Sequence, residues 1–189
     1  EGAHALVAGA GVRRTDDKFV NNLNIFNLDP RTKGLWILNA FVQDRIDLGR
    51  GLAVTAGVKA EKTTFTGVEI MPSLRLAWQP NAGHLLWASA NRAVREPSRI
   101  DRDLAAPGIL VPGTFNGEDL TAFEIGYRGQ PSSNTTVSVV GFYNLYDGLR
   151  STQITPGTIL PVRLANGIRG ENWGVEAWGA VQVAPGVRM

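Results

Sequence analysis

The sequence predicts an all-β fold, namely part of an antiparallel, up-and-down transmembrane β-barrel. Apolar residues recur at every second position along most of the 189 residues, which is the period of a strand with one polar and one apolar face. Short turns alternate with longer polar links, a pattern typical of outer-membrane barrels. Trp and Tyr residues lie near both ends of the apolar bands, where a bilayer meets water.

The composition further restricts the class of protein to which the chain can belong. Hydrophobic residues make up 43% of the chain and charged residues 19%, which is typical of a folded protein. The net charge of +2 gives no support for a nucleic-acid partner. The absence of cysteine excludes disulfides, a thiol nucleophile and Cys-based zinc sites. No apolar run approaches the roughly 20 residues that a membrane-spanning helix needs.

About eight strands are expected, several of them longer than is usual in soluble sheets. Residues 36–48 carry apolar side chains at even positions, and only Asp44 interrupts that face. Residues 52–61 continue with Val and Ala on one side and Thr, Gly, Lys and Glu on the other. The remaining expected strands are residues 5–13, 70–79, 85–94, 123–128, 136–146 and 173–183. In a barrel, their polar faces would line the lumen, because charge facing lipid is costly.

The connections alternate in length. Turns rich in Gly, Pro, Asn and Ser are expected at residues 48–51, 80–83, 130–134 and 184–186. Longer polar links are expected at residues 15–33, 95–119 and 151–167, with a tighter one near 65–69. A soluble meander can alternate in the same way, so a soluble all-β ligand-binding module remains an alternative.

The aromatic residues favour the membrane interpretation. Trp78 and Tyr127 lie a few residues from the short turns, whereas Trp36, Tyr146 and Trp173 lie beside the long links. Amphipathic rings favour the headgroup level of a membrane. The alternative for each ring is an ordinary core aromatic of a β-sandwich.

A series of strand motifs resembles the barrel of the TonB-dependent outer-membrane receptors, the family that imports siderophores, cobalamin and other scarce nutrients. The motifs, in chain order, are F-V-Q-D at 41–44, L-x-x-x-x-G-x-K at 52–59, M-P-S-L-R-L-A-W at 71–78, N-R-A-V-R-E-P-S-R at 91–99, L-T-A-F-E-I-G-Y-R at 120–128, G-F-Y-N-L-Y-D at 141–147 and N-W-G-V-E at 172–176. Asn91 and Glu96 depart from the Ser and Thr usual in the family. Order and spacing make the match specific, although each motif alone is weak.

The resemblance implies a barrel of about 22 strands, of which roughly eight are here, with a lumen filled by a plug. Residues 1–189 would then be part of the barrel domain, with the plug domain outside the sequence. The implied function is active import of a scarce nutrient, such as a ferric siderophore or a similar metal complex, across the bacterial outer membrane. The implied partners are the small-molecule ligand, the protein's own plug, outer-membrane lipid and lipopolysaccharide, and the inner-membrane TonB complex, engaged through the missing N-terminal region. No cofactor is expected. A passive porin remains an alternative.

Catalysis is not expected. The two histidines, His4 and His84, lie far apart and beside turns or strand starts, and neither H-E-x-x-H nor G-x-S-x-G occurs. The chain is therefore predicted to be neither an enzyme nor a metal-binding protein.

Candidate ligand-binding residues fall in two segments, residues 92–103 and the link at 151–167. The first set is Arg92, Arg95, Arg99 and Arg102, whose guanidinium groups could bind a carboxylate or phosphate of an anionic ligand at the outer vestibule. The alternative is that they pair with neighbouring acids, or with lipopolysaccharide phosphates, and stabilise the loop base. The second set is Gln153, Arg163 and Asn166, which would form a vestibule wall.

Overall fold

The computed structural model describes residues 3–20, 25–154, 157, 159–184 and 187–189. The expected turn at 184–186 lies mostly outside these described residues, since 185 and 186 are not among them.

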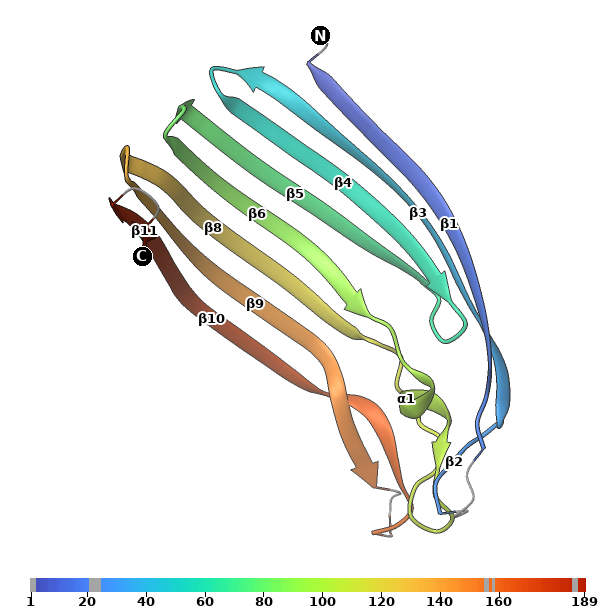
Figure 1. Ribbon diagram of the computed structural model, residues 1–189. Coiled ribbons are helices and arrows are strands. Elements are labelled where there is room, and N and C mark those ends of the chain that lie inside the picture. Colours follow the sequence, from blue (N-terminus) through green and yellow to red (C-terminus); the bar gives the residue numbers. More distant parts are fainter. Residues whose placement is uncertain (1–2, 21–24, 155–156, 158, 185–186) are drawn as a thin grey trace.

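Eight long antiparallel strands form one sheet, with the short β11 at its end, in the order β1-β3-β4-β5-β6-β8-β9-β10-β11. Their bounds are β1 His4–Lys18, β3 Thr32–Gly49, β4 Leu52–Thr63, β5 Val68–Asn81, β6 His84–Arg95, β8 Glu118–Ser132, β9 Thr135–Ile154, β10 Val162–Ala184 and β11 Val187–Arg188. The smaller elements are β2 Asn27–Leu28, α1 Arg99–Asp103 and β7 Leu104–Ala105. Figure 1 shows a curved, open sheet in which β1 and β10 lie at opposite edges.

The sheet confirms the predicted all-β, up-and-down architecture. Each long strand pairs with the next long strand along the chain, without crossovers. The strands run further than expected at the loop end: Val162 pairs with Ile154, so the expected link at 151–167 is mostly strand. Hairpin pairing therefore continues past the apolar band into a polar region.

The first short turn shows why glycine is needed there. Gly49, Arg50 and Gly51 all have positive φ values, which favour glycine and give the twist of a tight hairpin. A Cβ on Gly51 would lie 2.0 Å from the carbonyl oxygen of Gln79 on β5. The turn is therefore held close to the neighbouring hairpin as well as tightly closed.

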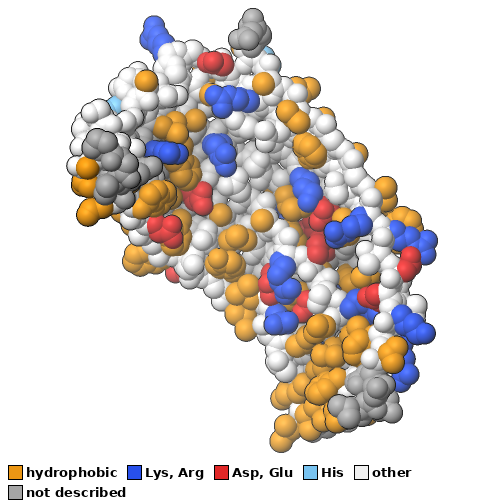
Figure 2. All heavy atoms as spheres, viewed as in Figure 1, with side chains coloured by type: hydrophobic (Ala, Val, Ile, Leu, Met, Phe, Trp, Pro, Cys, Tyr) orange, Lys and Arg blue, Asp and Glu red, His pale blue; other side chains and the backbone are white. Residues whose placement is uncertain are grey.

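The two faces of the sheet differ as the period-two pattern predicts. On the convex face, large apolar side chains are exposed, among them Leu74 and Ile125 at 51% and 68%. The other face carries polar residues such as Arg45, Thr55 and Arg75, which lie in one register row across β3, β4 and β5. Charged side chains gather along the middle of the face seen in Figure 2.

A small core lies at the loop end of the sheet. Within the described chain, the buried hydrophobic residues are Leu28, Ala53, Ala106, Phe115 and Ala165. All but Ala53 belong to the links or to the loop-end part of β10. A single-layer sheet buries few side chains by itself, so the burial of these residues depends on the links that fold against the sheet.

Candidate functional site at the loop end

The segment that joins β6 to β8, residues 96–117, folds back over the concave side of the sheet (Figure 1). We call it the inner loop. Ser98 and Asp101 form a capping box at the start of α1, in which each backbone N–H donates to the other side chain. A helix of one turn is not stable alone, so these caps and the docking contacts hold it. Its side chains Arg99, Asp101 and Asp103 are all buried.

One side of the inner loop docks on the β1–β3 end of the sheet. β7 pairs with β2, and the backbone N–H of Asp29 donates to the carbonyl oxygen of Asp103 at 2.8 Å. Lys33 Nζ lies 2.7 Å from the Asp103 carboxylate. Arg99 forms ion pairs with both Asp103 and Asp17. The loop is therefore fixed to β1 and β3 by charge as well as by backbone hydrogen bonds.

The other side docks on β9 and β10. Arg150 Nη1 on β9 lies 3.0 Å from Oδ1 of Asp101. Asn166 on β10 donates from Nδ2 to the carbonyl oxygens of Gly117 and Gly148, at 2.5 and 2.6 Å. The inner loop thus bridges the two sides of the curved sheet, which requires it to lie across the concave face.

The inner loop also follows the loop end of β10. The N–H of Val111 donates to the carbonyl of Val162 at 3.0 Å, and the N–H of Val162 donates to the carbonyl of Ile109 at 2.8 Å. These bonds attach residues 109–111 of the inner loop to the backbone of β10.

Two phenylalanine rings lie beneath cations of the site. Phe115 is fully buried, and the Arg95 guanidinium lies 5.2 Å from its ring centroid. Phe65, in the turn between β4 and β5, has Lys33 Nζ at 4.5 Å and the Arg102 guanidinium at 5.8 Å. Such cation–π contacts add to the burial of the rings. They join the β4–β5 turn to the inner loop.

Asp101 is the carboxylate on which the inner loop converges. It is 1% exposed, and its oxygens accept hydrogen bonds from Ser98, Arg150 and Arg95. Burial alone would raise its pKa, but the bonds from Ser98 and Arg150 and the charge of Arg95 outweigh this, so the pKa lies below the ordinary Asp value. Asp101 is therefore an anion that stabilises the folded loop.

This arrangement predicts that acid loosens the inner loop. Because the folded-state pKa of Asp101 is lowered, its contribution is complete above the unfolded pKa of about 4 and is lost as pH falls through the folded value. Hydrogen exchange of residues 96–117 in the full-length receptor should speed up as pH falls below about 4, after correction for intrinsic rates. In Asp101→Asn the loop should already be looser at neutral pH, with a flatter pH profile. Equal profiles in both proteins would contradict the role of Asp101.

The structure pairs Arg95 and Arg99 of the predicted set with acids. Arg95 Nε lies 2.5 Å from Oε2 of Glu118, and Arg99 is only 5% exposed. Burial alone would lower the pKa of Arg99, but hydrogen bonds to Asp103 and Asp17 raise it above the ordinary value. These contacts are the pairing with acids that the sequence left open as the alternative.

Arg92 has a different position. The ladder between β5 and β6 ends at the pair Ser73–Asn91, next to Pro72, which has no N–H to donate. Arg92 Nη1 donates to the carbonyl oxygen of Ile70 at 2.5 Å, and its Nη2 pairs with Glu69 and Asp119. Arg92 therefore bridges a gap in the sheet that Pro72 creates.

The remaining predicted residues are divided between structural and free positions. Arg102 donates from Nη1 to the carbonyl oxygen of Phe115 and to Asn116 Oδ1, both at 2.9 Å. Asn166 holds the inner loop, as described above. Gln153 and Arg163 lie opposite each other on β9 and β10, both exposed, and neither side chain has a partner among the described residues. Their parity is opposite to that of Arg150 and Asn166, which reach the inner loop, so they face away from the concave side and differ from the expected vestibule wall.

Sequence reasoning missed several members of this site. Lys33, Asp17, Arg150, Phe65 and Phe115 all contribute to it from other segments. The one local signal was the spacing Ser98-x-x-Asp101, which is close to a capping box.

The convex face holds four of the five predicted interface aromatics. Trp36, Trp78 and Trp173 are exposed there, at 45%, 45% and 75%. Tyr127 shares this face and bonds with His84 Nδ1 at 2.7 Å. Tyr146 differs from the expectation, because it has the same parity along β9 as Asn144 and so faces the concave side.

No group of three or more His, Cys, Asp or Glu residues that could hold a metal ion occurs among the described residues. No helix in the described part of the chain is long and apolar enough to cross a membrane.

Comparison with protein families gives a match over residues 2–186 to "TonB dependent receptor-like, beta-barrel". The chain belongs to this family. The outer-membrane location and the expectation that the chain is no enzyme are thereby confirmed, because the family consists of outer-membrane receptors and transporters. A sequence search of curated proteins found no match.

Solved structures of siderophore receptors and of an iron transporter share the fold of this chain. The ferric enterobactin receptor PfeA of Pseudomonas aeruginosa, in complex with enterobactin, aligns with a TM-score of 0.82 at 16% identity over 98% of this chain and 32% of its own. The siderophore receptor PirA of P. aeruginosa gives 0.78 at 16% identity, over 96% and 34%. The FrpB iron transporter of Neisseria meningitidis gives 0.71 at 16% identity, over 96% and 31%. The chain spans about a third of the length of these receptors.

Proposed function

We propose that this chain is part of a receptor that binds a ferric siderophore or a similar metal complex outside the cell and imports it with energy from the TonB complex. The observation that carries the proposal is the fold shared with three iron and siderophore receptors over at least 96% of the chain. The proposed action is transport, in which no bond of the ligand is made or broken.

The concave face supports a lumen filled by a plug domain that lies elsewhere in the receptor. Polar side chains of β3, β4, β5 and β6 line a shallow hollow of about 270 Å3 on this face, among them Arg45, Thr55, Arg75 and Asn91. Arg45 and Arg75 have no ion-pair partner among the described residues. Burying a guanidinium group without a hydrogen-bond or ion-pair partner costs free energy. We therefore expect a polar surface of the plug to lie opposite Arg45 and Arg75.

The convex face would contact lipid. Its apolar side chains are exposed in a chain of an outer-membrane family, and lipid is the environment in which such exposure is stable. Trp36 and Trp173 would lie at the outer interface, and Trp78 and Tyr127 at the periplasmic one.

The import proposal is tested with the full-length receptor in cells that lack their other ferric-siderophore receptors. Uptake of radiolabelled iron from a panel of ferric siderophores should depend on the receptor and should stop when TonB is deleted. Uptake that continues without TonB would indicate a passive porin. Failure to take up any ferric complex would overturn the choice of ligand class.

Arg163 and Gln153 have unpaired donors at the loop end, whereas Arg95 and Arg99 are neutralised by acids. The strand register places Arg163 and Gln153 on the face opposite Arg150 and Asn166, which reach the inner loop. A ligand held in the concave vestibule would not contact them, so Arg163→Ala should bind an anionic ferric siderophore with the affinity of the wild type. Equilibrium binding to the full-length receptor measures this.

Arg169→Ala is the matched control, because Arg169 is an exposed arginine of the same strand that is already paired with Asp147. Its affinity should equal that of the wild type. A loss of affinity in Arg163→Ala alone would show that the ligand contacts this outer side of the wall.

A further inference from the structure

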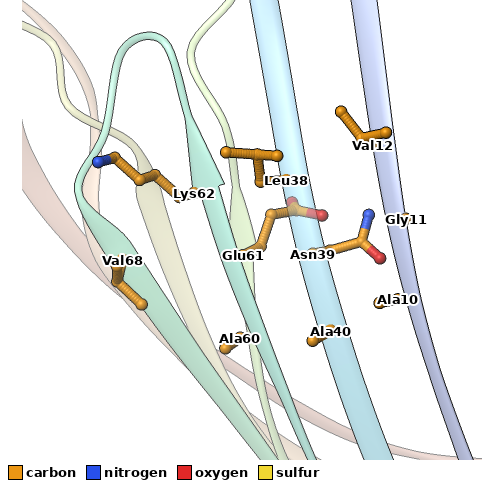
Figure 3. Close-up of a pocket in the computed structure, with 10 residues that line it drawn as sticks. All are labelled: Ala10, Gly11, Val12, Leu38, Asn39, Ala40, Ala60, Glu61, Lys62 and Val68. Atoms are coloured by element: carbon orange, nitrogen blue, oxygen red, sulfur yellow. The ribbon is translucent and has the colours of Figure 1, made fainter.

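A hollow of about 530 Å3 lies on the convex face, away from the vestibule. It is a groove that crosses β1, β3 and β4 and reaches Val68 at the start of β5 (Figure 3). Ala10, Ala40 and Ala60 lie in one register row and form its floor. The next row toward the loop end carries larger side chains, including Leu38 and Val68, that form one wall. The groove is an open, shallow depression, formed because three methyl groups stand beside these larger neighbours.

The position of the groove puts it near the outer boundary of the membrane. Trp36 lies on the same face of β3, two residues from Leu38 toward the loop end. A tryptophan at this place is typical of the headgroup level. The groove therefore begins just inside the outer leaflet and opens toward its headgroups.

Lys62 stands at the loop-end rim of the groove. In the sheet register it lies beside Leu38 on one side and Val68 on the other, and its side chain is exposed. No ion pair or hydrogen bond of Lys62 occurs within the described residues. The acid nearest along the strand, Glu61, faces the concave side, where Lys59 pairs with it at 2.8 Å. Lys62 is therefore an uncompensated cation beside apolar residues.

A second cation lies one row above the groove wall. Arg14 is the register partner of Trp36, and its guanidinium lies 5.2 Å from the indole centroid. Asp16 pairs with Arg14 at 3.0 Å and neutralises part of this charge. The rim thus keeps a net positive charge, contributed by Lys62.

We propose that this groove binds one lipid of the outer leaflet whose headgroup carries phosphate. An acyl chain would lie over Ala10, Ala40 and Ala60, and Lys62 would extend its ammonium group to the phosphate. Apolar lining and an unpaired cation at the headgroup level match the two parts of such a lipid. The proposal does not depend on which nutrient the receptor imports.

Native mass spectrometry of the full-length receptor tests the proposal. The probe is purified lipid A, titrated into the detergent-solubilised receptor in its phosphorylated form and in an enzymatically dephosphorylated form. Since one lysine near an anionic headgroup is worth about 1 kcal/mol, Lys62→Ala should weaken binding of phosphorylated lipid A by about fivefold. It should leave the dephosphorylated form unaffected. Lys62→Arg should retain binding.

Two further variants separate the groove from general lipid contact. Ala40→Leu places a larger side chain on the groove floor and should weaken both forms of lipid A. Lys59→Ala removes a cation of the same strand on the concave face and should change neither. Equal binding by the wild type and Lys62→Ala, equal binding of the two lipid forms, or no effect of Ala40→Leu would each overturn the proposal.

Discussion

Arg99→Ala is expected to release the inner loop from the β1–β3 end of the sheet. Arg99 is 5% exposed and lies between the carboxylates of Asp17 and Asp103, and it also donates to the carbonyl oxygen of Pro30. Removing one member of a buried ion pair leaves uncompensated charge, which costs about 3–5 kcal/mol. Lys33 still neutralises part of the charge on Asp103. The carboxylate of Asp17 and the carbonyl oxygen of Pro30 are therefore the groups most affected by the loss of the guanidinium. Hydrogen exchange across residues 96–117 of the full-length receptor measures the opening.

Arg169→Ala again serves as a control, because the Arg169 side chain is 83% exposed and its pair with Asp147 is solvated. Exposed ion pairs contribute little to stability, so exchange in the inner loop should not change. Arg99→Lys keeps the charge but loses the fork that reaches two carboxylates and a carbonyl, and should restore protection only in part. Full protection in Arg99→Ala would show that backbone pairing of β2 with β7 is sufficient to hold the loop.

The strands and their faces could be predicted because both depend on local sequence. A period of two decides which residues share a face, and neighbouring strands of an up-and-down sheet pair in chain order. The sequence therefore predicts that Trp36 and Ile125 lie on the apolar face, and the strand register places them there. The expectation for Tyr146 differs from the register because Tyr143 and Tyr146 lie on opposite faces of β9, and proximity to a loop does not identify the face.

The site could not be predicted in the same way, because its contacts join segments far apart in the chain. Arg99 meets Asp17, and Arg150 meets Asp101, only after the sheet curves and the inner loop folds across it. A run of mixed charges shows that pairing is possible but not which groups pair. The position of Arg92 depends on the ladder gap beside Pro72, and a proline within a strand is the local signal that could have indicated it.

Phe115→Ala should open the other side of the inner loop by a comparable amount. Phe115 is fully buried, and truncation of a buried phenylalanine costs about 3–5 kcal/mol through lost transfer energy and the cavity left behind. The stacking of Arg95 on the ring is lost as well. Hydrogen exchange near residues 109–117 should rise in the full-length receptor. Phe123→Ala is the control, because that ring is 44% exposed on the convex face and its removal leaves no internal cavity.

The double variant Arg99→Ala with Phe115→Ala shows whether the inner loop opens as one unit. Arg99 ties the loop to β1, and Phe115 lies in the part of the loop that follows β10. If each side docks independently, the two free-energy changes should add within about 0.5 kcal/mol, as they do for distant sites. If the loop is a single cooperative unit, the first variant already opens it and the second adds little. The helix α1 lies between the two docked sides of the inner loop and is capped at its start. This favours the cooperative result, because movement of one docked side would displace the helix and, with it, the other side. Simple additivity, with exchange confined to one side in each single variant, would contradict it.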